Sequence, residues 1–343
     1  MKLLVIKDPH FRKGFGSPES RVDDYDDVIE DKLSQIEKIS KDKGIDYIVF
    51  TGDVLDKKYP SSYSFGAIMS NLELIEKIKG FSKKGILSIA GNHDLPYSSY
   101  DNVNNSVYKL AMSHLKDISY SKIEDDKTSV YGIPYVEHDK VMDEISKINE
   151  QADPEKSNVV VLHEHFIPFD SEIGDLKYSS FFKYTDVKKF SNIKFFVYGH
   201  LHKGFEPRNY ELEGGNSQWH INPYSLYRLA RNYYTVSGEH VPEVTYIDTE
   251  SEDVYNIKLK VGDFSIVFDR NLLNQETEND ENLNKYIQSI SSILKSLFIE
   301  SSNFLSLSDS SSILDSRTAF SLSSCSFWSL YSCSVFIHPF LCL

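Results

Sequence analysis

The sequence predicts an α/β fold in which parallel strands alternate with helices. Short apolar runs recur along the chain, and each is followed by a turn that carries Asp, His or Asn. Amphipathic stretches of helical period separate the first three runs. Such alternation favours parallel pairing, with the helices packed on the faces of the sheet. Functional residues collect beyond the carboxyl ends of the strands in such sheets, so the turns after the runs are the expected position of a site.

The first part of the chain repeats this pattern. Apolar runs predict strands at residues 3–6, 47–50 and 86–90. The stretches between them, 28–43 and about 65–84, have the period of amphipathic helices. Each strand is therefore expected to lead through a polar loop into a helix.

Two later runs, at residues 159–162 and 195–198, predict two further strands. From residue 205 onward, strand-like segments joined by turns replace the helical period. These segments are residues 205–212, 218–221, 244–248 and 254–261. They predict a second, more antiparallel sheet that closes the fold.

Composition divides the end of the chain from the rest. Residues 1–262 carry all of these patterns and are expected to form one domain, whereas residues 263–300 favour at most one polar helix. Residues 301–343 are rich in serine and show neither a helical nor a strand period. Two interpretations of this tail stand: it is poorly ordered, or the natural reading frame or end of the gene has been lost there.

The charge balance limits the classes of function. A net charge of −14 argues against a protein that grips nucleic acid through a broad basic face, so nucleic-acid binding would need a local site or a partner. The acidic runs at residues 23–27 and 124–126 fit solvated surface. All three cysteines lie in the last twenty residues without CxxC spacing, which disfavours a disulfide framework.

Targeting segments are not expected. No run approaches the roughly 20 apolar residues of a membrane helix, and the first residues are too charged for a signal peptide. We therefore expect no membrane association and a cytoplasmic location, in a host cell if the chain is phage-encoded.

Five short blocks of chemically active residues follow the predicted strands. They are Asp8-x-His10, Gly52-Asp53-x-x-Asp56, Gly91-Asn92-His93-Asp94, His163 and Gly199-His200-x-His202. A single Asp-x-His arises often by chance, and a lone histidine after a strand is more often structural than a ligand. Five blocks in this order, each at a strand end, instead favour one shared site.

The residue types in these blocks point to divalent metals and phosphate esters. Carboxylate oxygens and imidazole nitrogens suit Mn²⁺, Fe²⁺ or Zn²⁺. Two such ions about 4 Å apart can clamp a phosphoryl group and lower the pKa of a water between them. A bridging carboxylate is needed to hold two cations that close. The glycines at 52, 91 and 199 fit sharp turns and close backbone approach.

The five blocks resemble those of the calcineurin-like metallophosphoesterase superfamily over roughly residues 1–205. The resemblance implies a four-layer α/β/β/α sandwich of two packed sheets flanked by helices. It also implies two metal ions, with Mn²⁺ expected first and Fe²⁺, Zn²⁺ or Mg²⁺ as alternatives. The implied ligands are Asp8, His10 and His202 for one ion, Asn92, His163 and His200 for the other, and Asp53 between them.

The same resemblance assigns the remaining block residues. His93 would be the acid near the leaving group, oriented by Asp94, and Asp56 would help to orient the metal-bound histidines. His165 competes with His163, which we prefer because it directly follows the apolar run. Four other histidines match no block and are expected to be structural or at the surface: His114, His138, His220 and His240.

Within the superfamily the chain is most similar to the SbcD-type DNA-repair nucleases, including compact phage-encoded members. The first block begins almost at residue 1, and Asp94 stands where the Ser/Thr phosphatases carry Glu. The segment Trp219-His220-Ile221-Asn222-Pro223-Tyr224-Ser225-Leu226 resembles the Asn-Pro-Gly-Ser step of these nucleases, with Tyr224 in place of Gly. Pro9 and Arg12 depart from the more usual opening of the first block.

This resemblance implies a Mn-dependent DNA exonuclease or endonuclease subunit in repair or recombination. It also implies an SbcC-type coiled-coil ATPase subunit that binds the segment at residues 263–300, and it is compatible with a homodimer. Four basic residues follow metal blocks and would rim the site for a polyanion: Arg12, Lys57, Lys58 and Lys203.

Two other functions remain as alternatives. The first is a small-molecule or nucleotide phosphodiesterase or phosphatase that uses the same site. The second is a catalytically silent subunit that scaffolds an ATPase, which the intact set of ligand residues disfavours.

Overall fold

The structure is a computed structural model that describes most of the first 262 residues. The described residues are 1–18, 21–167, 181–212, 214–227, 241–262, 267–269, 271, 282, 285 and 289. The chain forms two compact units, Met1–Leu273 and Asn274–Leu343. Nearly all of the predicted partner-binding segment at 263–300 lies outside the described residues. The tail at 301–343 and His240 lie wholly outside them.

The first sheet is built around three parallel strands that the sequence predicts. Its strands, in spatial order, are β14 (Asp253–Lys258), β13 (Glu243–Asp248), β1 (Lys2–Ile6), β2 (Tyr47–Phe50), β3 (Ile86–Ser88) and β4 (Lys116–Asp117). Strands β1 to β4 run parallel, and β13 and β14 extend the sheet antiparallel beside β1. The predicted strands at 3–6, 47–50 and 86–90 are therefore confirmed, to within two residues at their ends.

The second sheet contains the two later predicted strands at its centre. Its strands, in spatial order, are β11 (Phe205–Glu211), β12 (Ser217–Asn222), β10 (Phe195–Gly199), β7 (Ser157–His163), β6 (Thr128–Ile133) and β5 (Lys122–Glu124). The inner four run parallel, and both edge strands run antiparallel. A short parallel pair, β8 (Phe166–Ile167) and β9 (Phe182–Lys183), lies outside the two large sheets.

The late strands do not form a sheet of their own, although the sequence predicts one. Strands β11 and β12 complete the second sheet beside β10, whereas β13 and β14 complete the first sheet beside β1. Lys2 of β1 pairs with Asp248 of β13 across almost the whole described length of the chain. Alternation of apolar and polar residues marks a strand but does not identify its partner, so the assignment to one antiparallel sheet was wrong.

The two longest helices begin at residues whose side chains cap them. Asp24 caps α1 (Tyr25–Lys43) by accepting hydrogen bonds from the main-chain N–H groups of Asp26 and Asp27, and Gly44 ends it with a φ of 62°. Ser64 caps α2 (Phe65–Lys79) in the same way. The other helical segments are η1 (Pro60–Ser62), η2 (Pro96–Ser98), η3 (Tyr100–Asn105), α3 (Val107–Ala111), α4 (His138–Gln151) and α5 (Tyr184–Val187). None of the described helices is long and apolar enough to cross a membrane.

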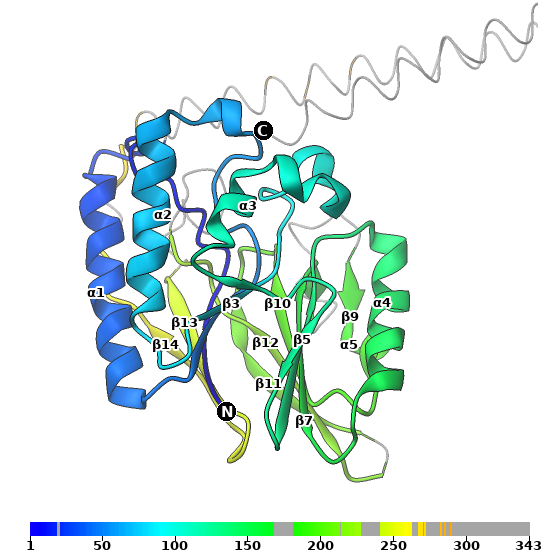
Figure 1. Cartoon of the computed structure of the whole chain (residues 1–343). Coiled ribbons are helices and arrows are strands. Elements are labelled where there is room, and N and C mark those ends of the chain that lie inside the picture. The colour runs from blue at the N-terminus through cyan, green and yellow to red at the C-terminus, as the bar shows by residue number, and fades with distance from the viewer. Residues whose placement is uncertain are drawn as a thin grey trace, which may run out of the picture. The chain divides into compact units, whose positions relative to one another are not determined.

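Three apolar clusters separate four layers, which confirms the predicted sandwich (Figure 1). Successive residues of β1 point to opposite faces of the first sheet. Leu4 and Ile6 pack with α1 and α2, whereas Leu3 and Val5 face the second sheet. On the far side of the second sheet, Val160 and Leu162 pack with residues of α4. The helices therefore cover the outer faces, and the two sheets bury their inner faces against each other.

Candidate metal centre

The five blocks meet at one edge of the sandwich, where the parallel strands of both sheets end. Asp8 and His10 follow β1, and Asp53 follows β2. His163 is the last residue of β7, and His200 directly follows β10. In Figure 1 this edge is at the top, because β1 begins at the marked N-terminus below and runs upward. The sandwich thus brings together residues from two sheets that are far apart in sequence.

Several of these residues have backbone conformations that side chains other than glycine rarely adopt. The φ angles are 39° for Asp8, 41° for His10, 46° for Asp53 and 79° for His200. Such left-handed residues cost on the order of 1–3 kcal/mol each and cluster at functional sites. Four of them at the ends of three strands mark this edge as a functional site, independently of the sequence motifs.

Two glycines of the blocks are needed for close approach, as the sequence indicates. A Cβ on Gly52 would lie 2.9 Å from the Cα of Gly91, and Gly52 also has a φ of +100°. A Cβ on Gly91 would lie 2.8 Å from Cε1 of His163. Both distances are shorter than side-chain carbons tolerate, so any other residue would push the loops that carry Asp53 and Asn92 apart.

One candidate metal cluster contains His10, Asp53 and His202. Their ligand atoms all lie within 4.8 Å of one another. Nε2 of His10 lies 3.5 Å from Oδ2 of Asp53 and 3.2 Å from Nε2 of His202. Asp8 adjoins the cluster, with its Oδ2 3.9 Å from Nε2 of His202. Its two oxygens also accept hydrogen bonds from the Thr51 hydroxyl and the main-chain N–H of His200, which fix its orientation.

The other candidate cluster contains Asp53, His163 and His200, again within 4.8 Å. Nε2 of His163 lies 3.4 Å from Oδ2 of Asp53 and 3.0 Å from Oδ1 of Asn92. Nδ1 of His163 lies 2.8 Å from the carbonyl oxygen of Thr51, which can only accept a hydrogen bond. That contact keeps the proton on Nδ1 and leaves Nε2 as the ligand atom.

Asp53 belongs to both clusters, which is the geometry expected of a bridging carboxylate. Its Oδ2 faces His10 on one side and His163 on the other. Burial alone would raise the pKa of Asp53, but His163, His93 and His10 around it hold the pKa well below its usual range. Asp53 is therefore ionised at neutral pH, as a carboxylate that neutralises two cations must be.

Two histidines of the clusters, one from each, are suited to donate lone pairs. Burial lowers the pKa of His10 to about 4, although Asp53 opposes the shift. Burial also holds the pKa of His200 well below its usual value, with His163 adding to the effect. Neutral imidazoles are the form that binds metals. A cation between His10 and His202 would also explain why their two nitrogens lie so close.

His163 differs, because burial would lower its pKa but the carboxylates of Asp53 and Asp8 raise it to about 9. The pKa of Asp8 is raised as well, to about 6, chiefly by burial. In the metal-free protein both groups therefore hold protons at mildly acidic pH. Metal ions must displace these protons, so metal affinity is coupled to pH.

We expect Mn²⁺ affinity to rise on the order of 100-fold from pH 6 to pH 8, because protons compete for His163 over that whole range. The sign follows from the raised pKa values: the proton-bearing form, which cannot bind metal, dominates at lower pH. Calorimetric titration in two buffers of different ionisation enthalpy would measure about one proton released at pH 7. Affinity that does not change with pH would show that His163 is not a ligand.

The structure corrects the predicted role of Asp94. Its carboxylate accepts hydrogen bonds from the main-chain N–H groups of Val54, Leu55 and Gly91, at 2.9 to 3.1 Å. It therefore ties the loop after β2 to the loop after β3 and does not orient His93. Burial and the negative charge of Asp53 raise the pKa of Asp94 to about 7 despite these donors.

Asp56 orients His93 instead, through its main chain. Nδ1 of His93 lies 3.1 Å from the carbonyl oxygen of Asp56, so Nδ1 donates and Nε2 is the atom that can hold or move a proton. The main-chain N–H of His93 donates to Oδ1 of Asp53 at 2.8 Å. The predicted contact of Asp56 was with the metal-bound histidines, whereas in the structure its carbonyl oxygen positions His93.

The four basic residues predicted to lie around the site contact other groups of the protein. Arg12 and Lys57 lie 3.6 and 3.4 Å from the carboxylate of Asp56. Lys58 donates to the hydroxyl of Ser98 at 3.3 Å. The main-chain carbonyl of Lys203 accepts a hydrogen bond from Asn222. Their role in binding a polyanion stays a prediction.

The remaining histidines behave as the sequence predicts where they are described. His165 stacks on His200 at 4.0 Å between ring centroids but belongs to neither cluster, which favours His163 in the ligand position. His220 is buried against Tyr198 and Phe166, and His114 pairs with Glu76.

One residue of the site escaped the sequence analysis. Lys7 is fully buried next to Asp8, and its ammonium group donates to the carbonyl oxygen of Leu201, between His200 and His202. Burial lowers the pKa of Lys7 to about 8, opposed by Asp8 and Glu243. A lysine directly after a buried apolar run was the available signal, because such a position is otherwise apolar.

The Asn222-to-Leu226 step packs directly against the last metal block. The main-chain N–H of Ser225 lies 3.4 Å from the carbonyl oxygen of His202, and that of Leu226 lies 3.2 Å from the carbonyl of Lys7. A Cβ on Gly204 would lie 2.8 Å from the Cα of Tyr224. The step therefore supports the loop that carries His200 and His202.

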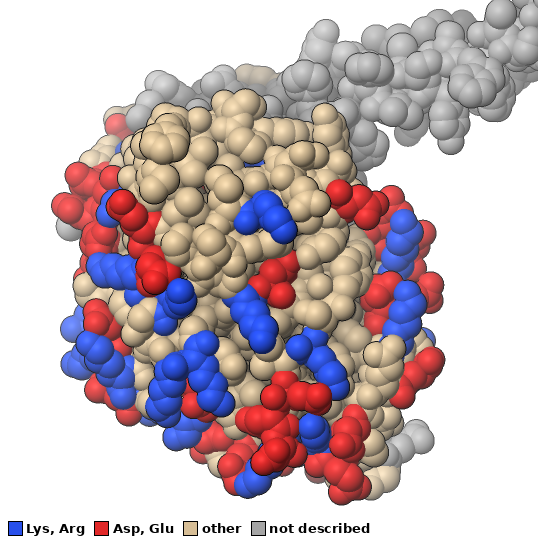
Figure 2. Space-filling view, in the orientation of Figure 1, with Lys and Arg blue, Asp and Glu red and all other residues tan. Residues whose placement is uncertain are grey.

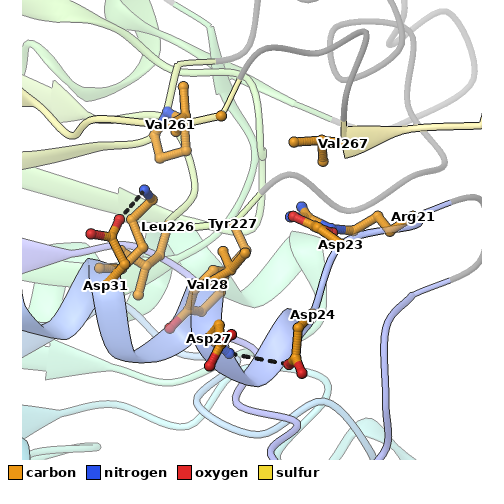
Figure 3. Close-up of a pocket in the computed structure, with 13 residues that line it drawn as sticks. Arg21, Asp23, Asp24, Asp27, Val28, Asp31, Leu226, Tyr227, Val261 and Val267 are labelled. Carbon is orange, nitrogen blue, oxygen red and sulfur yellow. Dashed lines mark hydrogen bonds and ion pairs between the residues drawn. The ribbon is translucent and has the colours of Figure 1, made fainter.

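A cavity of about 320 Å³ beside the start of α1 is a different feature (Figure 3). None of its lining residues belongs to the five blocks. Three of its four acidic groups have structural partners, since Asp23 pairs with Arg21, Asp24 caps α1 and Asp31 lies 3.4 Å from Lys32. The cavity is therefore not the candidate catalytic site.

Comparisons with known proteins agree with this geometry. Residues 1–204 match the family model described as calcineurin-like phosphoesterase. The chain is 25% identical over 205 residues to the 3',5'-cyclic adenosine monophosphate phosphodiesterase CpdA of Haemophilus influenzae, covering 59% of this chain and 70% of that protein.

A second curated relative is a DNA-repair protein. The chain is 25% identical over 185 residues to the DNA double-strand break repair protein Mre11 of Saccharolobus solfataricus. The match covers 51% of this chain and 46% of that protein, so it spans about half of the relative's length. Among solved structures, TT1561 of Thermus thermophilus is similar with a TM-score of 0.44 and 11% identity, covering 76% of this chain and 99% of that one.

Proposed function

Given that the chain belongs to the calcineurin-like phosphoesterase family, and is thus a metal-dependent phosphoester hydrolase, we propose that it is a DNA nuclease subunit. The observation that carries the two-metal chemistry of this proposal is the shared carboxylate of Asp53, which lies 3.5 Å from His10 and 3.4 Å from His163. Two histidine clusters joined in this way suit two cations and a phosphodiester between them.

We assign the two metal ions to these clusters, with Mn²⁺ as the expected ion. Asp8, His10 and His202 would hold one ion, Asn92, His163 and His200 the other, and Asp53 both. Bound there, the pair would supply Lewis-acid activation of the phosphodiester and of the attacking water.

The protein's own groups would orient the reaction. The Thr51 carbonyl holds the proton on Nδ1 of His163, and the Asp56 carbonyl does the same for His93. His93 would then use Nε2 to hold or donate a proton at the leaving oxygen. Asp94 ties the loop after β2 to the loop after β3, which fixes the position of Asp53 relative to His93.

Three observations support DNA as the substrate. The Mre11 relative is named as a DNA-repair protein. The Asn222-to-Leu226 step, which resembles that of SbcD-type nucleases, packs on the loop of His200 and His202. Arg12, Lys57 and Lys58 lie on or beside the loops of the first two blocks, where they can balance phosphate charge. A role in repair or recombination with an SbcC-type ATPase would follow from that substrate.

A cyclic-nucleotide or other small-molecule phosphodiesterase is the second candidate. It is favoured by the match to CpdA, which covers more of this chain and more of the relative than the match to Mre11 does. Both candidates use the same metal clusters, so only the substrate separates them.

We expect purified protein with Mn²⁺ to degrade single-stranded or duplex DNA, because the site is built for a phosphodiester and lies among basic loops. Cleavage would be followed with end-labelled oligonucleotides, and EDTA should abolish it. The same preparation would be tested on bis-p-nitrophenyl phosphate and 3',5'-cyclic AMP. Activity confined to these small esters would reject the nuclease and favour the second candidate.

A further inference from the structure

Two loops that carry metal blocks continue side by side beyond the metal centre. The loop after β2 runs from Asp53 to Tyr59, and the loop after β3 runs from Asn92 to Tyr97. They are joined first by the contact between His93 and the Asp56 carbonyl, at 3.1 Å. Lys58 then donates to the hydroxyl of Ser98 at 3.3 Å. Beyond that contact the loops end in two tyrosines.

Tyr97 presents its side chain to solvent from an unusual backbone. It is 78% exposed, and both Tyr97 and Ser98 have left-handed φ angles, of 55° and 51°. Bulky residues rarely adopt this conformation. A side chain so exposed cannot owe its position to burial, so packing of the Tyr97 ring does not account for the local geometry. Hydrogen bonds of Ser98 to Leu95 and Lys58 hold it.

Tyr59 contacts the Tyr97 ring edge to face. The two ring centroids are 5.9 Å apart and the rings are nearly perpendicular, at 76°. Tyr59 is itself 39% exposed. In this edge-to-face arrangement the Tyr59 ring supports the Tyr97 ring. One face of the Tyr97 ring stays accessible, so that a further planar group can stack on it.

The surface around these loops suits a base more than a run of phosphates. Figure 2 shows that uncharged side chains dominate the upper part of this face, whereas Lys, Arg, Asp and Glu gather on its lower part. The loops after β2 and β3 lie at the upper end of the same view (Figure 1). A strand bound at the metal centre that continued toward this part would therefore meet a mostly uncharged surface, on which Tyr59 and Tyr97 are exposed.

We propose that Tyr97, supported by Tyr59, is a stacking platform for an unpaired nucleobase of the strand whose phosphodiester lies at the metal centre. The inference rests on the proposed nuclease function and narrows its substrate to a single-stranded or frayed DNA end. A base inside a duplex is stacked on both faces, so the ring is open only to an unpaired base or to a base at a frayed end. Aromatic stacking accepts every base, which suits a nuclease without sequence preference.

The reach of the loop fits this role. Tyr97 is four residues from His93, so their Cα atoms are at most about 14 Å apart. One strand of B-form DNA advances about 3.4 Å per nucleotide. The stacked base would thus lie a few nucleotides from the cleaved bond, which makes its position measurable.

The test is a double-mutant cycle between Tyr97 and the base. A single abasic site is moved one position at a time along an oligonucleotide, away from the cleaved bond, and kcat/KM is measured for wild type and Tyr97→Ala. At one position we expect the abasic site to lower wild-type kcat/KM by roughly 5- to 150-fold. Tyr97→Ala should lower kcat/KM by the same factor on the intact oligonucleotide. An abasic site at that position should then lower the kcat/KM of Tyr97→Ala no further.

Controls separate stacking from folding and from catalysis. Tyr97→Phe keeps the ring and should match wild type, and Tyr255→Ala removes an exposed tyrosine of β14 at 38% exposure and should have no effect. All variants should hydrolyse bis-p-nitrophenyl phosphate within about twofold of wild type, because the remote contact is missing from that substrate. Binding in EDTA of an oligonucleotide with 2-aminopurine at the sensitive position should quench its fluorescence with wild type but not with Tyr97→Ala.

Three outcomes would overturn the stacking platform, and one of them would also overturn the nuclease function. DNA cleavage by wild type without coupling at any position would overturn the stacking platform and leave the nuclease standing. Hydrolysis of small esters without any DNA cleavage would overturn both proposals. Coupling that Tyr97→Phe also loses would overturn stacking and assign the effect to the tyrosine hydroxyl.

Discussion

His93→Ala is expected to lower turnover on DNA by roughly 10²- to 10⁴-fold while both metal ions stay bound. The metal clusters should survive because the contact between His93 and Asp53 uses the main-chain N–H, which alanine retains. The lost group is the imidazole, whose Nδ1 contacts the Asp56 carbonyl. A proton donor acts on the leaving oxygen in the transition state and contributes little to ground-state binding, so DNA affinity should change little.

Leaving-group dependence distinguishes this role from a structural one. A DNA 3'-alkoxide needs protonation as it departs, whereas p-nitrophenolate needs little. The loss should therefore be much larger on DNA than on bis-p-nitrophenyl phosphate. His114→Ala, which alters a surface histidine paired with Glu76, is the matched control and should be silent. Equal losses on both substrates, or loss of metal, would assign His93 to coordination or structure.

Asp53→Asn is expected to lower metal content from near two ions per chain to less than one. A carboxylate neutralises both cations at once, and a neutral amide cannot. The substitution removes the negative charge and keeps the local geometry, because an asparagine oxygen can still accept the hydrogen bond from the main chain of His93. Metal content would be measured by mass spectrometry after equilibrium dialysis against Mn²⁺.

Asp56→Asn is the matched control for this experiment. Its carboxylate also lies near the site but contacts Arg12 and Lys57 and belongs to neither cluster. Metal content of Asp56→Asn should equal that of wild type. Undiminished content in Asp53→Asn would mean that Asp53 does not bridge.

The sequence predicts the metal centre because its signals are local. Each block follows an apolar run, and the ends of parallel strands meet at one edge, so Asp8, Asp53 and His163 could be placed together without coordinates. The structure adds that Oδ2 of Asp53 is the shared atom. It also adds the Thr51 carbonyl, which no motif marks because a main-chain group has no sequence signal.

Features that depend on long-range pairing were not predicted. The pattern marks β13 as a strand but does not show that it pairs with β1. The resemblance to the family also implies that Asp94 orients its neighbour His93. In the fold the carboxylate instead reaches main-chain donors on two loops, because buried N–H groups there need an acceptor. Tyr97 has no signal in the sequence either, since its exposure and backbone angle appear only in the fold.

The central claim is that two histidine clusters joined by Asp53 hold two metal ions, and anomalous diffraction at the manganese edge from crystals grown with Mn²⁺ tests it most directly. We predict two peaks on either side of the Asp53 carboxylate, about 4 Å apart. His10 and His202 should contact one peak, and His163, His200 and Asn92 the other. A single peak, or peaks that Asp53 does not contact, would contradict the account.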